Sequence, residues 1–293
     1  MQSSYRYKKI DAFTAKGSLG NPAACFYLRP GQSLDEREML AGAKQHKGFV
    51  SEVIYCKSDH SNIHLTYYSS ECEVDFCGHG TIACMYSLIK DNPALLGQSE
   101  ILIQTNRKGT LTVYNRIAQR DAVLITAPAP VYIGTHLSGD TIAEKLGIKD
   151  TALNKSLPID LIDAGLRTLI VPLRDLETEI SFFPNEQALK SFCTQNDIDI
   201  ILVFSKEVLQ IGYIAHTRVF APKFGYLEDP ATGSGNSAFG YYMLKNKLWN
   251  GCDCCVEQGG NDRVFNEIFL SCMDGVVLFG GSATVRIDGD YYV

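Results

Sequence analysis

Two short segments of the sequence each place a pair of glycines beside side chains that can bind a ligand or move a proton. The first, CGHGT, begins at Cys77, and the second, TGSGN, begins at Thr232. When a Gly-x-Gly turn opens a helix, the first backbone N–H groups are accessible and the helix dipole favours negative charge there. The pattern therefore favours binding of a carboxylate, or of the enolate that forms when a neighbouring carbon loses a proton.

The two segments belong to an internal repeat. GHGTIACMYSLIK aligns without gaps with GSGNSAFGYYMLK, and the identical pairs are Gly78/Gly233, Gly80/Gly235, Ala83/Ala238, Tyr86/Tyr241 and Lys90/Lys245. A single Gly-x-Gly more often caps a turn before a packed helix, but its recurrence at equivalent positions favours a ligand site. We expect the two helix starts to face each other across a cleft.

The elements that must position these segments also repeat. Apolar strands expected at 23–28, 51–56 and 66–68 match strands expected at 168–173, 199–204 and 217–220, and each set precedes its glycine segment. This order predicts two copies of one supersecondary unit. Both expected helices are apolar nearly all the way round, so each must be enclosed by a curled sheet from its own repeat.

The boundary between the copies is expected at APAP, residues 127–130, because its two prolines favour extended backbone and stop any helix. We therefore predict an N-terminal lobe at 1–126 and a C-terminal lobe at 127–293. A C-terminal strand at about 280–293 is a candidate to pack onto the first lobe.

Composition excludes several classes of partner. The chain has 293 residues, 45% of them hydrophobic, and a net charge of −6 with scattered Lys and Arg, so it offers no basic field for nucleic acid. The N-terminal MQSSYRYKKI lacks the apolar stretch of a secretory signal, and no window approaches the roughly 20 apolar residues of a membrane span. We expect a cytoplasmic protein whose partner is a small molecule.

The ten cysteines are expected to be reduced, because a large chain without a signal segment does not need a disulfide framework. About half lie in apolar runs and are expected to act as small hydrophobic residues: Cys25, Cys56, Cys84, Cys193 and Cys272. A second group, Cys252, Cys254 and Cys255, resembles half of a thiolate metal site, but no CxxC pair or nearby histidine completes it. We predict neither a metal nor an organic cofactor.

Several motifs, in order along the chain, resemble one known family. DAFT at Asp11, GNPAAC at Gly20, SEVIYC at Ser51, EVDFCGHGTIAC and GYLEDPATGSGNSA are similar to motifs of the PhzF-like family, named for the phenazine-biosynthesis isomerase. The resemblance extends to about Gln258, and EDPATGS is its most specific motif. It implies an α+β fold of two pseudo-symmetric lobes, each a curved mixed sheet wrapped around a central helix, as in diaminopimelate epimerase. The site would lie in the groove between them.

The resemblance also implies the roles of the site residues. Glu52 matches the single general acid/base, and its apolar flanks Val50 and Val53 are expected to desolvate the carboxyl and raise its pKa. His79 and Asp229 match the positions that hold and polarise the substrate, and a helix N-terminus favours a neutral imidazole at His79. The expected substrate-binding positions are Asn21, Gly78, Gly80, Thr232, Gly233 and Ser234. Taken singly, Asn21 before Pro22 also fits an ordinary turn.

The function that the resemblance implies is cofactor-independent isomerisation of a small carboxylate, cyclic or amino-acid-like, with a homodimer as the expected assembly. Two alternatives stay open: a racemase that uses Cys77, and a binding protein without catalytic activity. The racemase would need a second thiol, but Thr232 occupies the equivalent place and is not deprotonated near neutral pH. QHKGFV before Ser51 and QGGNDRVF after the second helix depart from the family pattern, which affects the substrate more than the fold.

Overall fold

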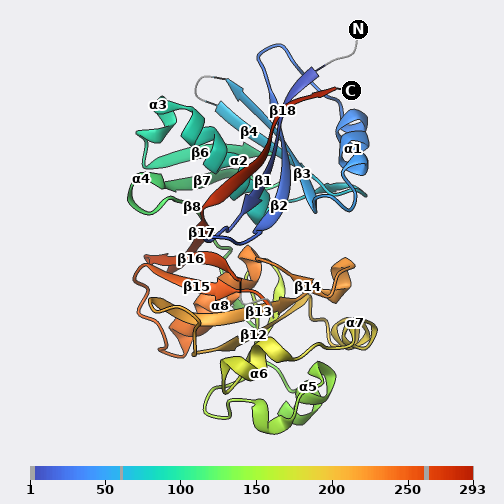
Figure 1. Cartoon of the computed structure of the whole chain (residues 1–293), viewed down its shortest axis with the longest axis vertical. Helices are drawn as coiled ribbons and strands as arrows, with labels where there is room; N and C mark the ends of the chain where they lie inside the picture. Colours follow the sequence, from blue (N-terminus) through green and yellow to red (C-terminus); the bar gives the residue numbers. More distant parts are fainter. Residues whose placement is uncertain (1–3, 60–61, 261–263, 293) are drawn as a thin grey trace. The chain divides into compact units, whose positions relative to one another are not determined.

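The computed structural model describes residues 4–59, 62–260 and 264–292. The chain forms two compact units: the first comprises Met1–Thr126 and Gly280–Val293, and the second comprises Ala127–Phe279. Figure 1 shows strands and helices in both units, coloured along the sequence.

The first unit is a mixed sheet with helices packed against it. Its strands are β1 (Ser4–Ala12), β2 (Asn21–Leu28), β3 (Glu52–Asp59), β4 (Asn62–Tyr68), β5 (Glu73–Val74), β6 (Glu100–Thr105), β7 (Gly109–Arg116), β8 (Ala122–Thr126) and β18 (Ala283–Tyr292). Its helices are α1 (Glu36–Gln45), α2 (Gly78–Asp91), α3 (Pro93–Leu96) and α4 (Ile117–Arg120). β1 pairs antiparallel with both β2 and β18, so the first and the last strand lie side by side in this unit (Figure 1).

The second unit has the same kinds of element. Its strands are β9 (Val131–Tyr132), β10 (Asp160–Asp163), β11 (Arg167–Pro172), β12 (Ile200–Ser205), β13 (Tyr213–Phe220), β14 (Glu228–Asp229), β15 (Cys254–Gln258), β16 (Asn266–Met273) and β17 (Val276–Gly281), which runs on into the first unit. Its helices are α5 (Gly139–Leu146), α6 (Leu176–Ser181), α7 (Glu186–Gln195) and α8 (Gly233–Lys245), with short 3-10 turns at Asp150–Ala152 and Pro222–Phe224.

The pattern of strand pairing occurs twice. In the first unit β1–β2 is antiparallel, β2–β3 parallel, β3–β4 antiparallel and β4–β6 parallel. In the second unit β10–β11, β11–β12, β12–β13 and β13–β15 follow the same order. All the strands predicted from the repeat are present. Along the sequence, α2 lies between β4 and β6, and α8 lies between β13 and β15, which are the final parallel pairs of the two copies. The prediction of a duplicated supersecondary order is confirmed at the level of elements and pairings.

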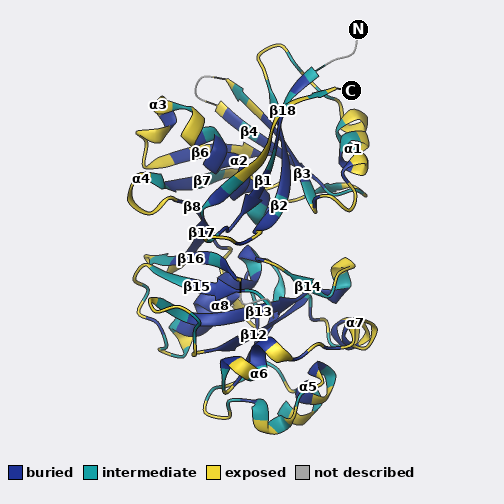
Figure 2. Cartoon of the chain, in the orientation of Figure 1, coloured by how far each residue is buried: buried dark blue, intermediate teal, exposed yellow. Residues whose placement is uncertain are grey.

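Both repeated helices are enclosed by their own unit. α2 contacts β1, β2, β3, β8 and β18, and α8 contacts β10, β11, β12 and β16. Nine residues of α2 and ten of α8 are buried, and α8 is drawn almost entirely in the colour of buried residues in Figure 2. Burial of each large apolar side chain contributes roughly 1.5–3 kcal/mol, which explains why these helices carry almost no polar face.

Glycine at the start of each repeated helix permits close packing. A Cβ on Gly80 would lie 2.6 Å from Ile54 Cδ1, and a Cβ on Gly233 would lie 2.3 Å from the Phe279 ring. Both glycines therefore have a packing role, in addition to any role that their backbone has in binding.

Replacing Gly233 by alanine should destabilise the second unit. The added methyl group overlaps the buried Phe279 ring, and overpacking of this kind costs roughly 1–3 kcal/mol. Urea unfolding followed by the fluorescence of Trp249, the one tryptophan in the sequence, measures the change. Gly97→Ala is the control, because its Cβ would meet only the Pro93 carbonyl at 3.9 Å. Equal unfolding midpoints for the two variants would contradict this packing argument.

The cysteines are all free thiols. Cys25, Cys56, Cys84 and Cys193 are buried as expected, whereas Cys272 is only half-buried, because it lies near the end of β16.

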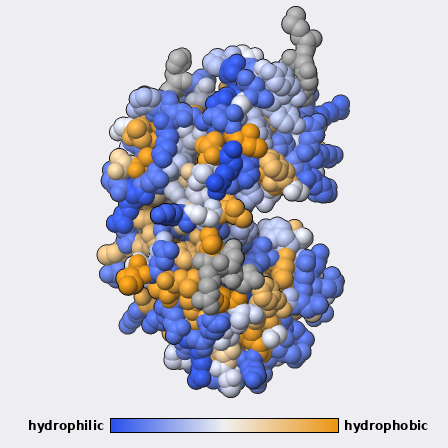
Figure 3. Space-filling view, viewed as in Figure 1, coloured by the Kyte–Doolittle hydropathy of each residue, from blue (hydrophilic) through white to orange (hydrophobic). Residues whose placement is uncertain are grey.

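Figure 3 shows apolar residues gathered on part of the visible face of the first unit, and the exposed apolar residues of β18 are Val285, Ile287 and Tyr292. Within the described residues, no helix has the length and apolar character needed to cross a membrane.

Candidate active site

Glu52 is positioned by the register of β3. It is the first residue of that strand and pairs with Ala23 in the parallel neighbour β2. Successive side chains of a strand alternate between the faces of a sheet, so Glu52 lies on the same face as Ile54. Because Ile54 packs against Gly80 at the start of α2, Glu52 is directed towards the N-terminus of that helix.

Cys77 and His79 form the start of α2. Cys77 is the N-cap residue, and its sulfur accepts a hydrogen bond from the Gly80 N–H at 3.2 Å. The Cys77 carbonyl accepts from the Thr81 N–H at 2.9 Å and from the Thr81 hydroxyl at 2.7 Å. The Gly80 amide already donates to a partner within the protein. The backbone amides of the half-buried Gly78 and His79 are therefore better placed to donate hydrogen bonds to a ligand.

The three side chains of this turn and strand meet. His79 Nε2 lies 3.3 Å from Glu52 Oε2, and Cys77 Sγ lies 3.8 Å from the same oxygen. Cys77 Sγ is also 3.5 Å from His79 Nδ1. The side chain of Glu52 is 24% exposed and that of His79 is 13% exposed, so the carboxyl is partly shielded but accessible to a small molecule.

His79 is a neutral imidazole at physiological pH. Burial lowers its pKa from 6.5 to about 4, and a hydrogen bond to the Pro22 backbone opposes this only in part. The sequence predicted a neutral ring because a helix N-terminus disfavours a positive charge. In the structure, desolvation is the main cause of the lowered pKa. A neutral imidazole can donate one hydrogen bond and accept another, which suits it to hold a substrate beside Glu52.

The His79 pKa predicts an acid-sensitive contribution to stability. A folded-state pKa below the unfolded value of 6.5 gives stability that is complete above pH 6.5 and is lost as the pH falls towards about 4. The free energy of unfolding should therefore fall less between pH 7.5 and pH 4.5 in His79→Gln than in the parent, by about 2 kcal/mol. Urea unfolding at both pH values measures this, with the exposed His136→Gln as control. An identical pH dependence in parent and His79→Gln is the contrary result.

In the second unit, Asp229 and Thr232 form one hydrogen-bonded group. Thr232 is the N-cap residue of α8, as Cys77 is of α2, and its hydroxyl donates to Asp229 Oδ2 at 2.7 Å. Gln258 organises the loop: its Nε2 donates to the Asp229 carbonyl at 2.9 Å, and its Oε1 accepts from the Thr232 N–H at 3.0 Å. The Asn236 side chain donates to the same Oε1 at 2.7 Å. The Thr232 hydroxyl thus orients the Asp229 carboxylate, and Gln258 fixes the backbone at both residues.

The remaining predicted residues occupy the starts of their elements. Asn21 is the buried first residue of β2 and pairs with Ala12. Gly233 and Ser234 open α8, and Ser234 is half-buried. The structure thus groups Glu52 and His79 in the first unit, and groups the predicted second-unit residues around one helix start. Sequence reasoning missed Gln258, whose only signal was its place at the start of the segment that departs from the family pattern.

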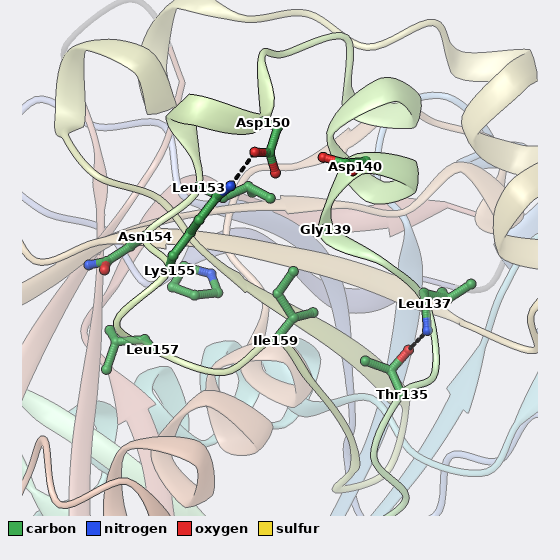
Figure 4. A pocket seen from close by; sticks show the side chains of 11 residues that line it. Thr135, Leu137, Gly139, Asp140, Asp150, Leu153, Asn154, Lys155, Leu157 and Ile159 are labelled. Atoms are coloured by element: carbon green, nitrogen blue, oxygen red, sulfur yellow. Dashed lines mark hydrogen bonds and ion pairs between the residues drawn. The ribbon is translucent and has the colours of Figure 1, made fainter.

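A separate cavity of about 440 Å³ lies in the second unit beside α5. None of the predicted site residues lines it (Figure 4). In its lining, Lys155 pairs with Asp150, and the Leu137 N–H donates to Thr135 Oγ1 at 3.1 Å. Because Glu52 and His79 contact each other in the first unit, away from this cavity, we place the candidate site at the starts of β3 and α2.

The family profile PhzC-PhzF, described as phenazine biosynthesis-like protein, matches residues 10–275. The chain belongs to this family. The PhzC-PhzF chain is 28% identical over 241 residues to the uncharacterized isomerase YfhB of Bacillus subtilis, covering 80% of this chain and 79% of the relative. It is 29% identical over 304 residues to antisense-enhancing sequence 1 of Schizosaccharomyces pombe, covering 99% and 100%. Several curated members of the family are named isomerases, so this is a family of isomerase type.

Solved structures agree with this assignment. The Bacillus anthracis phenazine biosynthesis protein of the PhzF family superposes with a TM-score of 0.83 and 25% identity, covering 99% of both chains. A hydroxyproline epimerase from Agrobacterium vitis superposes with a TM-score of 0.57 at 11% identity, covering 100% of this chain and 92% of the epimerase. The second likeness concerns the fold alone. The predicted α+β, epimerase-like fold class is confirmed.

Proposed function

We propose that this PhzC-PhzF protein is a cofactor-independent isomerase that moves a proton on a small carboxylate-bearing substrate, with Glu52 as the single general acid/base. One observation carries the proposal: a partly shielded carboxyl lies 3.3 Å from an imidazole that is neutral at physiological pH, beside the start of a buried helix. The equivalent first residue of β12 is Ile200, so the second copy supplies no matching acid. One-base chemistry suits this asymmetry.

In the proposed reaction, the Glu52 carboxylate removes a proton from a substrate carbon and becomes a carboxylic acid. The electron pair of the broken C–H bond is delocalised towards the substrate carboxylate, where the N-terminus of α2 and its Gly78 amide stabilise the negative charge. The Glu52 acid then returns its proton to a different carbon on the same face. His79 supplies a neutral hydrogen bond during both steps.

We further propose that the polar groups of the second unit bind the substrate. Asp229, fixed by Thr232 and Gln258, would accept hydrogen bonds from a substrate amine or hydroxyl. The backbone and hydroxyl donors of Gly233 and Ser234 suit a carboxylate, and Asn21 is the remaining polar contact. A cyclic or amino-acid-like carboxylate carries both kinds of group. We propose a cytoplasmic homodimer as the assembly, which sedimentation measurements would test.

Solvent-deuterium exchange tests the proposed activity on many candidate substrates at once. The parent protein is incubated in D₂O with a panel of cyclic and amino-acid carboxylates, and mass spectrometry detects a gain of deuterium at carbon. We expect exchange into at least one compound that also raises the thermal unfolding midpoint. A compound that stabilises the protein but acquires no deuterium would favour binding without catalysis.

Binding without catalysis is the second candidate function. One relative that matches along its whole length is named antisense-enhancing sequence 1 rather than an isomerase. The thiol racemase is less favoured, because the N-cap residue of α8 is Thr232 where a second cysteine would be required. The exchange experiment separates binding from catalysis, and variants of Glu52 and Cys77 separate the two mechanisms.

A further inference from the structure

Three different donor atoms meet at one point in the first unit, and they come from Glu52, Cys77 and His79. The edges of the triangle are 3.3 Å from His79 Nε2 to Glu52 Oε2, 3.8 Å from Cys77 Sγ to that oxygen, and 3.8 Å from Cys77 Sγ to His79 Nε2. Among residues 4–59, 62–260 and 264–292, this is the one group of three His, Cys, Asp or Glu side chains with donor atoms within 4.8 Å of one another.

The triangle has the dimensions of a metal site. Tetrahedral zinc has bonds of about 2.3 Å to sulfur and roughly 2.0–2.2 Å to nitrogen and oxygen, which places the donor atoms roughly 3.3–3.6 Å apart. The nitrogen–oxygen edge of 3.3 Å lies within this range, and the two edges to sulfur, both 3.8 Å, lie just above it. Small side-chain rotations therefore suffice to bring all three donors onto one ion.

The surroundings of the triangle support ligation. The Gly80 N–H donates to Cys77 Sγ, a contact that stabilises a thiolate, and the hydrogen bond to the Pro22 backbone fixes the imidazole ring of His79. Such outer contacts typically orient the ligands of metal sites. Because the Glu52 and His79 side chains are 24% and 13% exposed, an ion can reach the triangle from solvent.

The chemistry of these three donor atoms determines which metal ion fits the site best. A carboxylate and a thiolate supply two negative charges, which balance one divalent cation. Thiolate and imidazole suit zinc, whereas magnesium and calcium prefer oxygen ligands. In the second unit the equivalent positions are Ile200, Thr232 and Ser234, so the repeat itself does not produce the cluster.

We propose that Glu52, Cys77 and His79 bind a zinc-class divalent cation at the start of α2. We also propose that the bound ion blocks proton transfer by occupying the Glu52 carboxylate, and only this second statement rests on the function proposed above. With three protein ligands, the fourth position of the ion is left to water.

Titration of the full chain with Co²⁺ tests the site by absorption, independently of activity. We expect a thiolate-to-cobalt charge-transfer band and visible bands of tetrahedral intensity, both removed by added Zn²⁺. Cys77→Ser keeps an oxygen that can cap α2 but removes the thiolate. It should abolish the charge-transfer band and weaken cobalt binding by at least roughly 10–100-fold. The matched control is Cys252→Ser, which removes an exposed thiol near Cys254 and Cys255 and should leave the spectrum unchanged.

The outcomes distinguish the two statements. Absence of a charge-transfer band in the parent would overturn the metal site, and so would a band that survives Cys77→Ser. A different result would separate the two proposals. If cobalt binding depends on Cys77 but exchange is uninhibited in protein saturated with Zn²⁺, the metal site stands and the role of Glu52 in catalysis is overturned.

Discussion

Glu52→Gln is expected to lower the rate of proton exchange by roughly 10²–10⁴-fold, the range that general acid–base catalysis contributes. Glutamine keeps the size and hydrogen bonding of the side chain but cannot accept a proton from carbon. Since the second unit has Ile200 at the equivalent position, no other acid replaces the lost function. Substrate binding should persist, so the loss should appear in kcat more than in KM.

Glu71→Gln is the matched control, because Glu71 is an exposed glutamate of the same unit that pairs with Lys47 at 2.8 Å. Its exchange rate should equal that of the parent. Glu52→Asp retains the acid on a shorter side chain and should recover part of the activity. If Glu52→Gln and Glu71→Gln exchange at the same rate, the proposed base is wrong.

Arg218→Met is expected to destabilise the second unit by about 2–5 kcal/mol, because it leaves two buried backbone carbonyls without a donor, at roughly 1–3 kcal/mol each. Arg218 is fully buried on β13, whereas its ion-pair partner Glu228 is 25% exposed. Its Nη2 and Nε atoms donate to the Glu228 carboxylate at 2.7 and 2.9 Å, and its Nη1 donates to the carbonyls of Glu179 and Phe182 at 2.7 and 2.8 Å. Methionine leaves the carboxylate and both carbonyls without these donors.

Trp249 fluorescence during urea unfolding measures this loss. Lys223→Met is the control, because the Lys223–Asp199 pair is about one quarter exposed on both sides, at 27% and 26%. Partly exposed pairs contribute about 1 kcal/mol or less. A loss for Arg218→Met no larger than that for Lys223→Met would show that the cluster does not stabilise the fold.

The sequence predicted the elements better than the contacts between side chains. Runs such as DIILVF form strands because buried β-branched and aromatic residues favour that conformation, and the repeat made their order predictable. The helix starts at Gly78 and Gly233 followed from the same alignment, and the structure adds that Cys77 and Thr232 are the N-cap residues. By contrast, the reach of Gln258 back to Asp229 depends on how β15 and the preceding loop meet, for which no local pattern exists.

The chemistry of the first unit was predictable only in part. Glu52 and His79 emerged from family motifs, but nothing in their spacing indicated that Cys77 would contact both of them. That contact arises from the parallel register that sets Glu52 opposite Ala23 and from the dense packing of Gly80 on Ile54. Such juxtapositions depend on pairing across the sheet, so they become visible only in three dimensions.

The most direct test of one-base catalysis compares Glu52→Gln with Cys77→Ser in the same solvent-deuterium exchange assay. Exchange should disappear in Glu52→Gln and stay within about tenfold of the parent in Cys77→Ser, because the thiol only contacts the base. Exchange that survives Glu52→Gln but disappears in Cys77→Ser would contradict the account and establish thiol chemistry instead.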